Sequence, residues 1–263
     1  MILLSLNDTI EVLHQRMGHI SKHRIRQMID KGLINYDKSD TDDFYTKHIC
    51  RSCLTSKRRP SYNRAIQKAK RPASRWYMDL TGPYTTTSIN GNKYKLSLID
   101  SHTNLAFEYY MKDKSASSVQ SKLQEFIDSV IIPRRVIDKD LGYIYILSDC
   151  GTEFNNQVIK DLLLKHGILQ KFSCPYTPET HGKIERLWRT IMEMSRAMLF
   201  ESGLPEEWWE HASCTALHIN NRIFTSTNDV SPWEKFFLEQ PKLDYLRVFW
   251  KFRLLSYTNT AQR

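Results

Sequence analysis

The sequence contains no long apolar run. None of its hydrophobic stretches approaches the ~20 apolar residues that a membrane-spanning helix needs, so we expect no membrane partner. The first residues, MILLSLNDTIE, turn polar too early for a signal peptide. The 5 cysteines are an odd number, which excludes complete pairing in disulfides. We therefore expect a reducing intracellular compartment, and we expect the cysteines without metal-ligand spacing to be buried: Cys150, Cys174 and Cys214.

Acidic residues are absent between Phe44 and Met78, although the chain as a whole has 29 of them. Nine of the 38 Lys and Arg residues lie between Arg51 and Arg75, and the net charge of the chain is +9. A stretch of this kind attracts a polyanion by releasing its counterions, which indicates nucleic acid. A solvated basic linker is an equally good interpretation of the stretch by itself.

Hydrophobic spacing predicts a helical N-terminal segment followed by an α/β domain. Residues 8–35 fit two helical pieces that break at Gly18, and residues 56–72, with two prolines, are typical of a linker. The expected strands are 76–80, 93–100, 105–112, 144–148 and 169–173. The expected helices are 115–130, 155–166, 181–201 and 206–222. The helix 181–201 has a predicted buried stripe of Ile184, Leu187, Trp188, Ile191, Met194 and Met198.

Three carboxylates have surroundings that suggest a site for divalent ions. Asp79 ends an apolar run in WYMDLTGPY, Asp149 ends another in YIYILSDCGTEF, and Glu185 lies in HGKIERLWRTI, which is helical in pattern. Carboxylate oxygens are preferred ligands of Mg²⁺ and Mn²⁺, which assist phosphoryl transfer. Each acid also has a structural interpretation, the aspartates as turn formers and Glu185 as a partner of Arg189 one helical turn on. Asp100, at another strand end, is a rival for either aspartate.

Two histidines and two cysteines in the first third of the chain could form a zinc site. LHQRMGH contains His14 and His19, and CRSC contains Cys50 and Cys53. Two nitrogens and two thiolates suit a closed tetrahedral zinc site, which stabilises a fold and does not catalyse.

The spacing leaves the choice of histidines open. His14 and His19 do not share a face of an unbroken helix, so Gly18 would have to bend the chain between them. His19 and His23 lie four residues apart and would share a helix face, and His48 is a further alternative close to the cysteines.

The segments MDLTGPY, SDCGTEF and TPETHGKIER, in this order, resemble the core motifs of retroviral-type integrases, and most closely those of copia-type LTR retrotransposons. Thirty-five residues separate Asp149 from Glu185, which matches the D,D-35-E spacing of that family. The resemblance implies an α/β, ribonuclease-H-like core with a mixed five-stranded sheet and flanking helices. It also implies that Asp79, Asp149 and Glu185 bind Mg²⁺ or Mn²⁺, and that the 3′-hydroxyl of element cDNA attacks a phosphodiester of target DNA.

LHQRMGHIS followed by CRSCLTSKRRP resembles the zinc-binding segment before the copia-type core, which favours His14 and His19 over His23 as partners of Cys50 and Cys53. The implied organisation is a zinc-binding helical module (1–55), a basic linker (56–72), a catalytic core (73–223) and a truncated C-terminal extension (224–263). The expected DNA contacts come from the linker and from the long helix: Lys57, Arg58, Arg59, Lys183, Arg186 and Arg189.

The resemblance covers about residues 10–249 and stops at Trp250, where the family pattern has glycine. We therefore expect a truncated copy of an element. The function that follows is DNA strand transfer in integration and transposition, by a homo-oligomer found in the nucleus and the cytoplasm. The alternative is a catalytically incompetent nucleic-acid-binding remnant of such an integrase.

Overall fold

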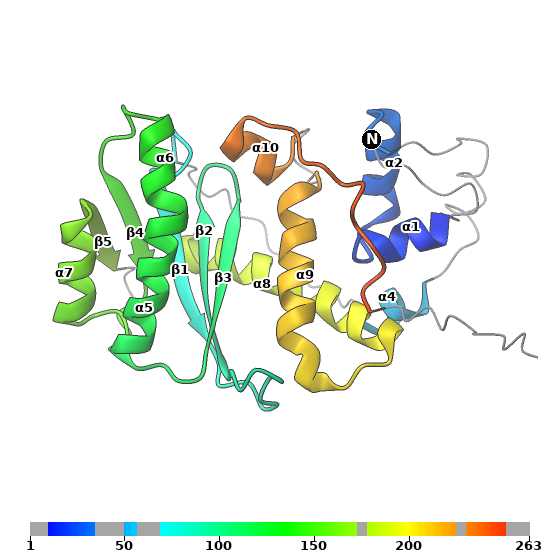
Figure 1. Cartoon of the computed structure of the whole chain (residues 1–263), viewed down its shortest axis with the longest axis horizontal. Helices are drawn as coiled ribbons and strands as arrows, with labels where there is room; N and C mark the ends of the chain where they lie inside the picture. The colour runs from blue at the N-terminus through cyan, green and yellow to red at the C-terminus, as the bar shows by residue number, and fades with distance from the viewer. Residues whose placement is uncertain (1–9, 35–49, 57–68, 173–177, 225–229, 251–263) are drawn as a thin grey trace, which may run out of the picture.

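The computed structural model describes residues 10–34, 50–56, 69–172, 178–224 and 230–250, and a five-stranded sheet organises this part of the chain (Figure 1). The strand order is β3-β2-β1-β4-β5. β1 (Arg75–Thr81) is antiparallel to β2 (Tyr94–Asp100), which is antiparallel to β3 (Ala106–Met111). β4 (Ile144–Ser148) is parallel to β1, and β5 (Ile168–Phe172) is parallel to β4. The predicted mixed sheet is confirmed.

Helices cover the sheet and extend beyond it. Those of the N-terminal half are α1 (Ile10–Arg16), α2 (Lys22–Asp30), α4 (Arg51–Ser56), α5 (Ala116–Phe126), a π-helical turn (Ile127–Ile131) and α6 (Ile132–Ile137). They are followed by α7 (Gln157–Lys165), α8 (Pro178–Ser202), a 3-10 turn (Glu206–Trp208), α9 (Trp209–Arg222) and α10 (Pro232–Phe237). Of the helices in the described ranges, none combines the length and the hydrophobicity of a membrane span.

Residues of β1 pack on both faces of the sheet. Trp76 and Met78 belong to the hydrophobic cluster that includes residues of α5 and α7, and the Trp76 ring meets the Phe126 ring edge-on at 4.9 Å between centroids. Tyr77 belongs to a second cluster, together with residues of α8 and α9. This alternation follows from the two-residue repeat of a strand, and it fixes which face each side chain near the end of β1 reaches.

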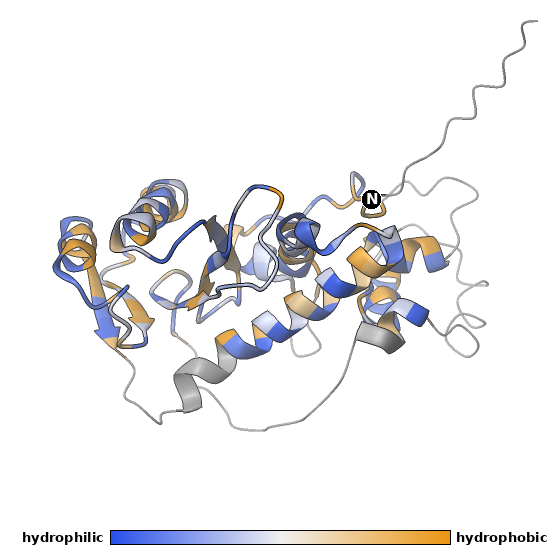
Figure 2. Ribbon diagram, turned by 90° about the horizontal axis from the view of Figure 1, so that it is seen from below, coloured by the Kyte–Doolittle hydropathy of each residue, from blue (hydrophilic) through white to orange (hydrophobic). Residues whose placement is uncertain are grey.

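The second cluster also contains the buried side chains of the N-terminal helices. Leu13 of α1, Met17 in the turn after it and Met28 of α2 are buried in this cluster, together with Ile191 and Met194 of α8. α8 runs from the sheet to α1, α2 and α4 (Figure 1), and hydrophobic and hydrophilic residues alternate along its length (Figure 2). The N-terminal helices therefore share a hydrophobic core with the long helix. The predicted division of the chain at residues 55 and 72 stays a prediction.

The helix predicted at 115–130 is longer and less regular than the sequence indicates. It continues through the π-helical turn into α6, where Pro133 stands in the first turn. Proline has no N–H and its ring clashes with the preceding turn of a regular helix, so the wider π turn makes room for it.

A further expectation is corrected by the structure. Cys150 and Cys214 are exposed, not buried, because Cys150 follows the end of β4 and Cys214 lies on the outer side of α9. Residues 230–250 form α10 and a segment that buries Leu243 and Leu246 against the N-terminal helices and α8. Cys174 lies outside the described residues.

Candidate metal centres and nucleic-acid interface

Strand register brings Asp79 and Asp149 to the same place on neighbouring strands. β1 and β4 are parallel, with Tyr77 opposite Leu147. If this register is continued by two residues, Asp79 lies opposite Asp149 at the carboxyl ends of the two strands. Neighbouring strands of a sheet are ~4.8 Å apart. Both aspartates then share a sheet face with Tyr77 and Leu147, which pack in the cluster that contains α8.

Glu185 lies on the helix that crosses this face. α8 contacts β1. Ile184 and Leu187 on either side of Glu185 are buried, whereas Glu185 itself is exposed together with Arg186 and Arg189. α8 therefore presents one carboxylate and two guanidinium groups on its solvent side, next to the strand that carries Asp79.

The three carboxylates share this region without forming a tight group. Within the described ranges, the one set of three or more His, Cys, Asp or Glu residues whose ligand atoms lie within 4.8 Å of one another is a His/Cys set. A looser arrangement of the three carboxylates is expected without cations, because like charges repel one another. Carboxylates that share two ions ~3.5–4 Å apart also do not all have to lie in contact with one another. The assignment of Asp79, Asp149 and Glu185 as metal ligands stays a prediction.

Both aspartates accept hydrogen bonds from nearby backbone. The N–H of Leu80 donates to Asp79 Oδ1 at 2.9 Å, and the N–H of Gly151 donates to Asp149 Oδ1 at 3.1 Å. Both side chains are half-buried. One oxygen of each carboxylate is thereby held in a fixed direction, so the turn-forming interpretation and the metal-binding interpretation are compatible.

Asp100 has a structural role that accounts for its position. It is completely buried, its Oδ1 accepts from the N–H of Ala73 at 3.0 Å, and its Oδ2 accepts from the N–H and the hydroxyl of Thr103, both at 2.7 Å. These bonds anchor the turn after β2 to the segment before β1. Asp100 is therefore a loop anchor and not a rival for the carboxylate site.

The structure describes the side chains of only two of the six residues predicted to contact DNA. Arg186 and Arg189 are exposed beside Glu185, where they could reach phosphates. Lys183 lies in α8, but its side chain is outside the described part of the structure, and so are Lys57, Arg58 and Arg59 entirely. DNA contact by all six residues stays a prediction.

A second candidate metal centre consists of His14, His19, Cys50 and Cys53. His14 Nε2 lies 3.3 Å from Cys53 Sγ, and His19 Nδ1 lies 3.3 Å from Cys50 Sγ. A tetrahedral zinc ion with Zn–S and Zn–N bonds of ~2.3 and ~2.1 Å sets its nitrogen and sulfur ligands ~3.5 Å apart. The donor set and its spacing therefore fit zinc. The alternative ligand His23 is exposed and is not part of this set.

A tight turn after α1 brings the two histidines together. α1 ends at Arg16, and both Gly18 (φ 62°) and His19 (φ 58°) adopt the left-handed conformation. The predicted bend at Gly18 is thus present. A Cβ at Gly18 would lie 2.9 Å from the terminal carbons of Met194 and Met198 of α8. Glycine is favoured here both by its backbone conformation and by the close approach of α8.

Replacing Gly18 by alanine is expected to destabilise the fold by about 1–3 kcal/mol. A left-handed conformation costs an L-residue about 1–2 kcal/mol, and moving the flexible ends of Met194 and Met198 out of the way adds about 1 kcal/mol or less. Gly32→Ala is a matched control, because Gly32 also has a left-handed φ of 69° and nothing lies within 4 Å of its added Cβ. Denaturant unfolding of both variants should show a larger loss for Gly18→Ala. Equal losses would mean that the contact with α8 is unimportant.

The His/Cys set is connected to the end of α8. Glu201, in the last turn of α8, accepts from Gln15 Nε2 of α1 at 2.7 Å and from Ser52 Oγ of α4 at 2.9 Å. α1 carries one histidine of the set, and α4 carries Cys53. One carboxylate thus joins both halves of the candidate zinc centre to the helix that carries Glu185. The sequence contains no signal for this connection, because it depends on tertiary contacts.

Comparison with known protein families finds two matches. The family described as "Integrase core domain" matches residues 69–178, and the family described as "GAG-pre-integrase domain" matches residues 2–58. The first match includes two of the candidate carboxylates, Asp79 and Asp149, and the second includes the whole His/Cys set.

Curated relatives and a solved structure show the same likeness. The retrovirus-related Pol polyprotein from transposon TNT 1-94 of Nicotiana tabacum is 30% identical over 81% of this chain, and that from transposon RE2 of Arabidopsis thaliana is 30% identical over 90%. The chain spans 15% of the length of either relative. A simian T-cell lymphotropic virus intasome structure, in complex with PP2A regulatory subunit B56 gamma, matches with a TM-score of 0.53 and 17% identity, over 85% of this chain and 76% of that chain. The match to the family described as "Integrase core domain", together with this structural likeness and the mixed five-stranded sheet, confirms the predicted fold class, a ribonuclease-H-like integrase core.

Proposed function

Because the chain belongs to the integrase family of retroelement Pol polyproteins, we propose that it joins 3′ ends of element cDNA to target DNA by metal-assisted strand transfer. The observation that supports this proposal is the parallel register of β1 and β4, with Tyr77 opposite Leu147. Continued by two residues, this register would bring Asp79 and Asp149 opposite each other on the face against which α8 packs. No protein nucleophile is needed for such a reaction, because the protein supplies position and charge.

The residues of the site have distinct proposed roles. Asp79, Asp149 and Glu185 would hold Mg²⁺ or Mn²⁺, which activates the attacking hydroxyl and stabilises charge on the leaving oxygen. The backbone hydrogen bonds to Asp79 and Asp149 hold one oxygen of each of these two carboxylates in place. The 3′-hydroxyl of the cDNA would lose its proton to solvent as its oxygen bonds to a target phosphorus. The target P–O3′ bond would break, and the released 3′-oxygen would take up a proton from solvent.

The remaining charged groups would bind and orient DNA. Exposed Arg186 and Arg189 flank Glu185 and can neutralise phosphates of the DNA that approaches it. The proposed partners are element ends, target DNA and further copies of this chain. The proposed role of the His/Cys set is to hold a structural zinc ion, since its four donors leave no ligand position open for a substrate.

A strand-transfer assay with the wild-type chain tests the proposal. A pool of short duplexes with randomised terminal base pairs would be incubated with supercoiled plasmid, and joined products would be sequenced. We expect joining with Mn²⁺ or Mg²⁺ and a loss to background when Ca²⁺ replaces them, because Ca²⁺ binds carboxylates with a looser and more variable geometry. DNA binding without joining under every condition would contradict strand transfer and support the binding remnant.

A further inference from the structure

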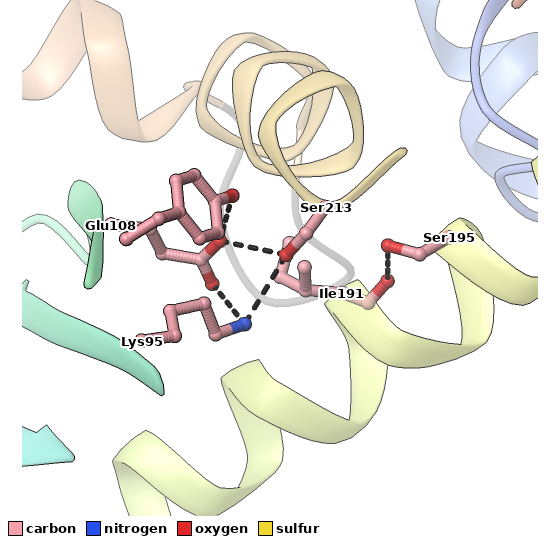
Figure 3. Close-up of polar contacts among 6 residues, drawn as sticks. Lys95, Glu108, Ile191, Ser195 and Ser213 are labelled. Atoms are coloured by element: carbon pink, nitrogen blue, oxygen red, sulfur yellow. Dashed lines mark hydrogen bonds and ion pairs between the residues drawn. The ribbon is translucent and has the colours of Figure 1, made fainter. Parts of the chain in front are cut away.

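A cluster of buried polar side chains lies between the sheet and α9 (Figure 3). Lys95 of β2 is fully buried, and its Nζ lies 2.7 Å from Glu108 Oε1 of β3 and 3.2 Å from Ser213 Oγ of α9. Ser213 Oγ and Tyr110 Oη donate to Glu108 Oε2 at 2.8 and 3.0 Å. The ammonium and the carboxylate are thus paired and hydrogen-bonded, as charges in a protein interior must be. We call these four residues the Lys95 cluster.

Burial keeps the phenol of the cluster neutral. Desolvation, and then the negative charge of Glu108, raise the pKa of Tyr110 well above its usual value. Tyr110 therefore remains a hydrogen-bond donor to Glu108 at all pH values at which the protein would work. The geometry of the cluster is held by fixed donors on two strands and one helix.

The Lys95 cluster contacts the helix that carries Glu185. Lys95 Nζ lies 4.5 Å from the centroid of the Trp188 ring of α8. A buried ammonium near an aromatic face is a favourable cation–π contact. Trp188 follows Glu185 by three residues, so the two side chains leave neighbouring positions on one side of α8. The contact between Lys95 and Trp188 therefore helps to fix the distance between α8 and the sheet near Glu185.

The cluster also borders Asp79. Asp79 is opposite Ser97 across the antiparallel β1–β2 pair, and Ser97 is opposite Glu108 across the β2–β3 pair. Residues opposite each other in this way have Cβ atoms ~4.5–5.5 Å apart on one face. The buried hydroxyl of Ser97, only 1% exposed, has no hydrogen-bond partner among the described residues. It is therefore an available donor between the Asp79 carboxylate and the Lys95–Glu108 pair.

We infer that Lys95, Glu108 and Ser213 of the Lys95 cluster are positioning residues for the carboxylates of Asp79, Asp149 and Glu185. They hold α8, which carries Glu185, at the distance from the sheet at which Glu185 can share metal ions with Asp79 and Asp149. This inference rests on the proposed function. Lys95 touches no reacting atom and acts through Trp188 of α8 and through the row that contains Ser97 and Asp79. Stability alone does not account for the pair, because a buried ion pair can often be replaced by apolar residues without loss of stability.

The double variant Lys95→Met/Glu108→Leu separates positioning from stability. It removes both charges together and leaves neither one buried alone, so its melting temperature is expected to fall less than that of either single variant. A moderate loss is expected, because the hydroxyls of Ser213 and Tyr110 lose their acceptor on Glu108. Mn²⁺ binding would be measured by calorimetry without DNA, on protein loaded with zinc beforehand. Loss of groups that orient metal ligands typically weakens metal binding 10–100-fold. We expect the apparent Kd for Mn²⁺ to rise about 10-fold or more, and the strand-transfer kcat to fall with the DNA KM unchanged.

Asn221→Leu is the matched control. Asn221 is a buried α9 residue whose amide exchanges two hydrogen bonds with the backbone of Ala106 in β3, at 2.7 and 3.1 Å. It joins the same two elements as the Ser213–Glu108 contact, but among the described residues its side chain makes no hydrogen bond to α8. We expect a lower melting temperature and an Mn²⁺ affinity within about 2-fold of the wild type, because the ligand-orienting contacts remain.

Two substitutions of Trp188 keep the test decisive if the double variant does not fold. Trp188→Leu removes the ring under Lys95, and Trp188→Phe keeps a ring there. We expect several-fold weaker Mn²⁺ binding for the leucine variant and near wild-type binding for the phenylalanine variant, because a phenyl ring retains most of the cation–π contact.

The outcomes separate this inference from the proposed function. Wild-type Mn²⁺ affinity in the double variant, or in Trp188→Leu if the double variant does not fold, would show that the cluster is merely structural and would leave strand transfer standing. Absence of Mn²⁺ binding to the wild type would overturn both. Weakened binding in the double variant, together with unchanged binding in Asn221→Leu, would establish the positioning role.

Discussion

Cys53→Ser is expected to lower the melting temperature of the whole described fold, and not only that of the N-terminal helices, by about 10–20 °C. Zinc binding to structural sites of this type contributes about 10–16 kcal/mol in isolated peptides. Loss of even about 5 kcal/mol lowers the melting temperature of a chain of this size by the amount stated. The physical reason is the shared core, in which Leu13, Met17 and Met28 pack with Ile191 and Met194 of α8.

The same reasoning predicts the effect of chelation. Removing zinc from the wild type should produce one cooperative transition at lower temperature, because Glu201 and the common hydrophobic cluster connect α1 and α4 to α8. Circular dichroism melts with and without a zinc chelator measure this, with Cys150→Ser as the control, since Cys150 is exposed and lies outside the His/Cys set. Two separate transitions, with that of the core unchanged, would show that the N-terminal module folds independently.

Glu185→Gln is expected to reduce strand transfer by 10³-fold or more, which corresponds to about 4 kcal/mol of transition-state stabilisation. The substitution preserves size and helix propensity but removes the negative charge that a divalent ion requires. Because Glu185 is exposed, the melting temperature should change little.

Glu193→Gln is the control for this variant. Glu193 lies on the same helix, eight residues later, and its replacement removes the same charge from α8. Joined products counted by sequencing should be close to wild type for Glu193→Gln and at background for Glu185→Gln. If both variants retained wild-type joining, Glu185 would not be a metal ligand, and the carboxylate site would have to be sought elsewhere.

Several parts of this account could be read from the sequence because the signals are local. The predicted stripe from Ile184 to Met198 repeats at helical spacing, and the structure buries all of its members except Trp188, which is half-buried. The strand predicted at 144–148 from its apolar run is β4, Ile144–Ser148. His14 and His19 can bind one metal ion only if the chain bends between them. Gly18 is the residue between them that adopts a left-handed conformation without strain.

Other parts depend on contacts that no local pattern shows. The parallel pairing of β1 with β4 joins segments about seventy residues apart, so the alignment of Asp79 with Asp149 was available only through resemblance to a family. Lys95 and Glu108 look like exposed strand charges in the sequence, yet α9 covers them. Leu243 and Leu246 lie in a short segment without helix or strand periodicity, and their burial comes from helices α1 and α8, which precede them in the chain.

The claim that three carboxylates share divalent ions is tested most directly by crystals soaked in Mn²⁺ and measured at the manganese absorption edge. The account predicts anomalous peaks between Asp79 and Asp149, with Glu185 as a further ligand. Data measured at the zinc absorption edge should show a separate peak among His14, His19, Cys50 and Cys53. Manganese peaks elsewhere on the protein, with none at the ends of β1 and β4, would contradict it.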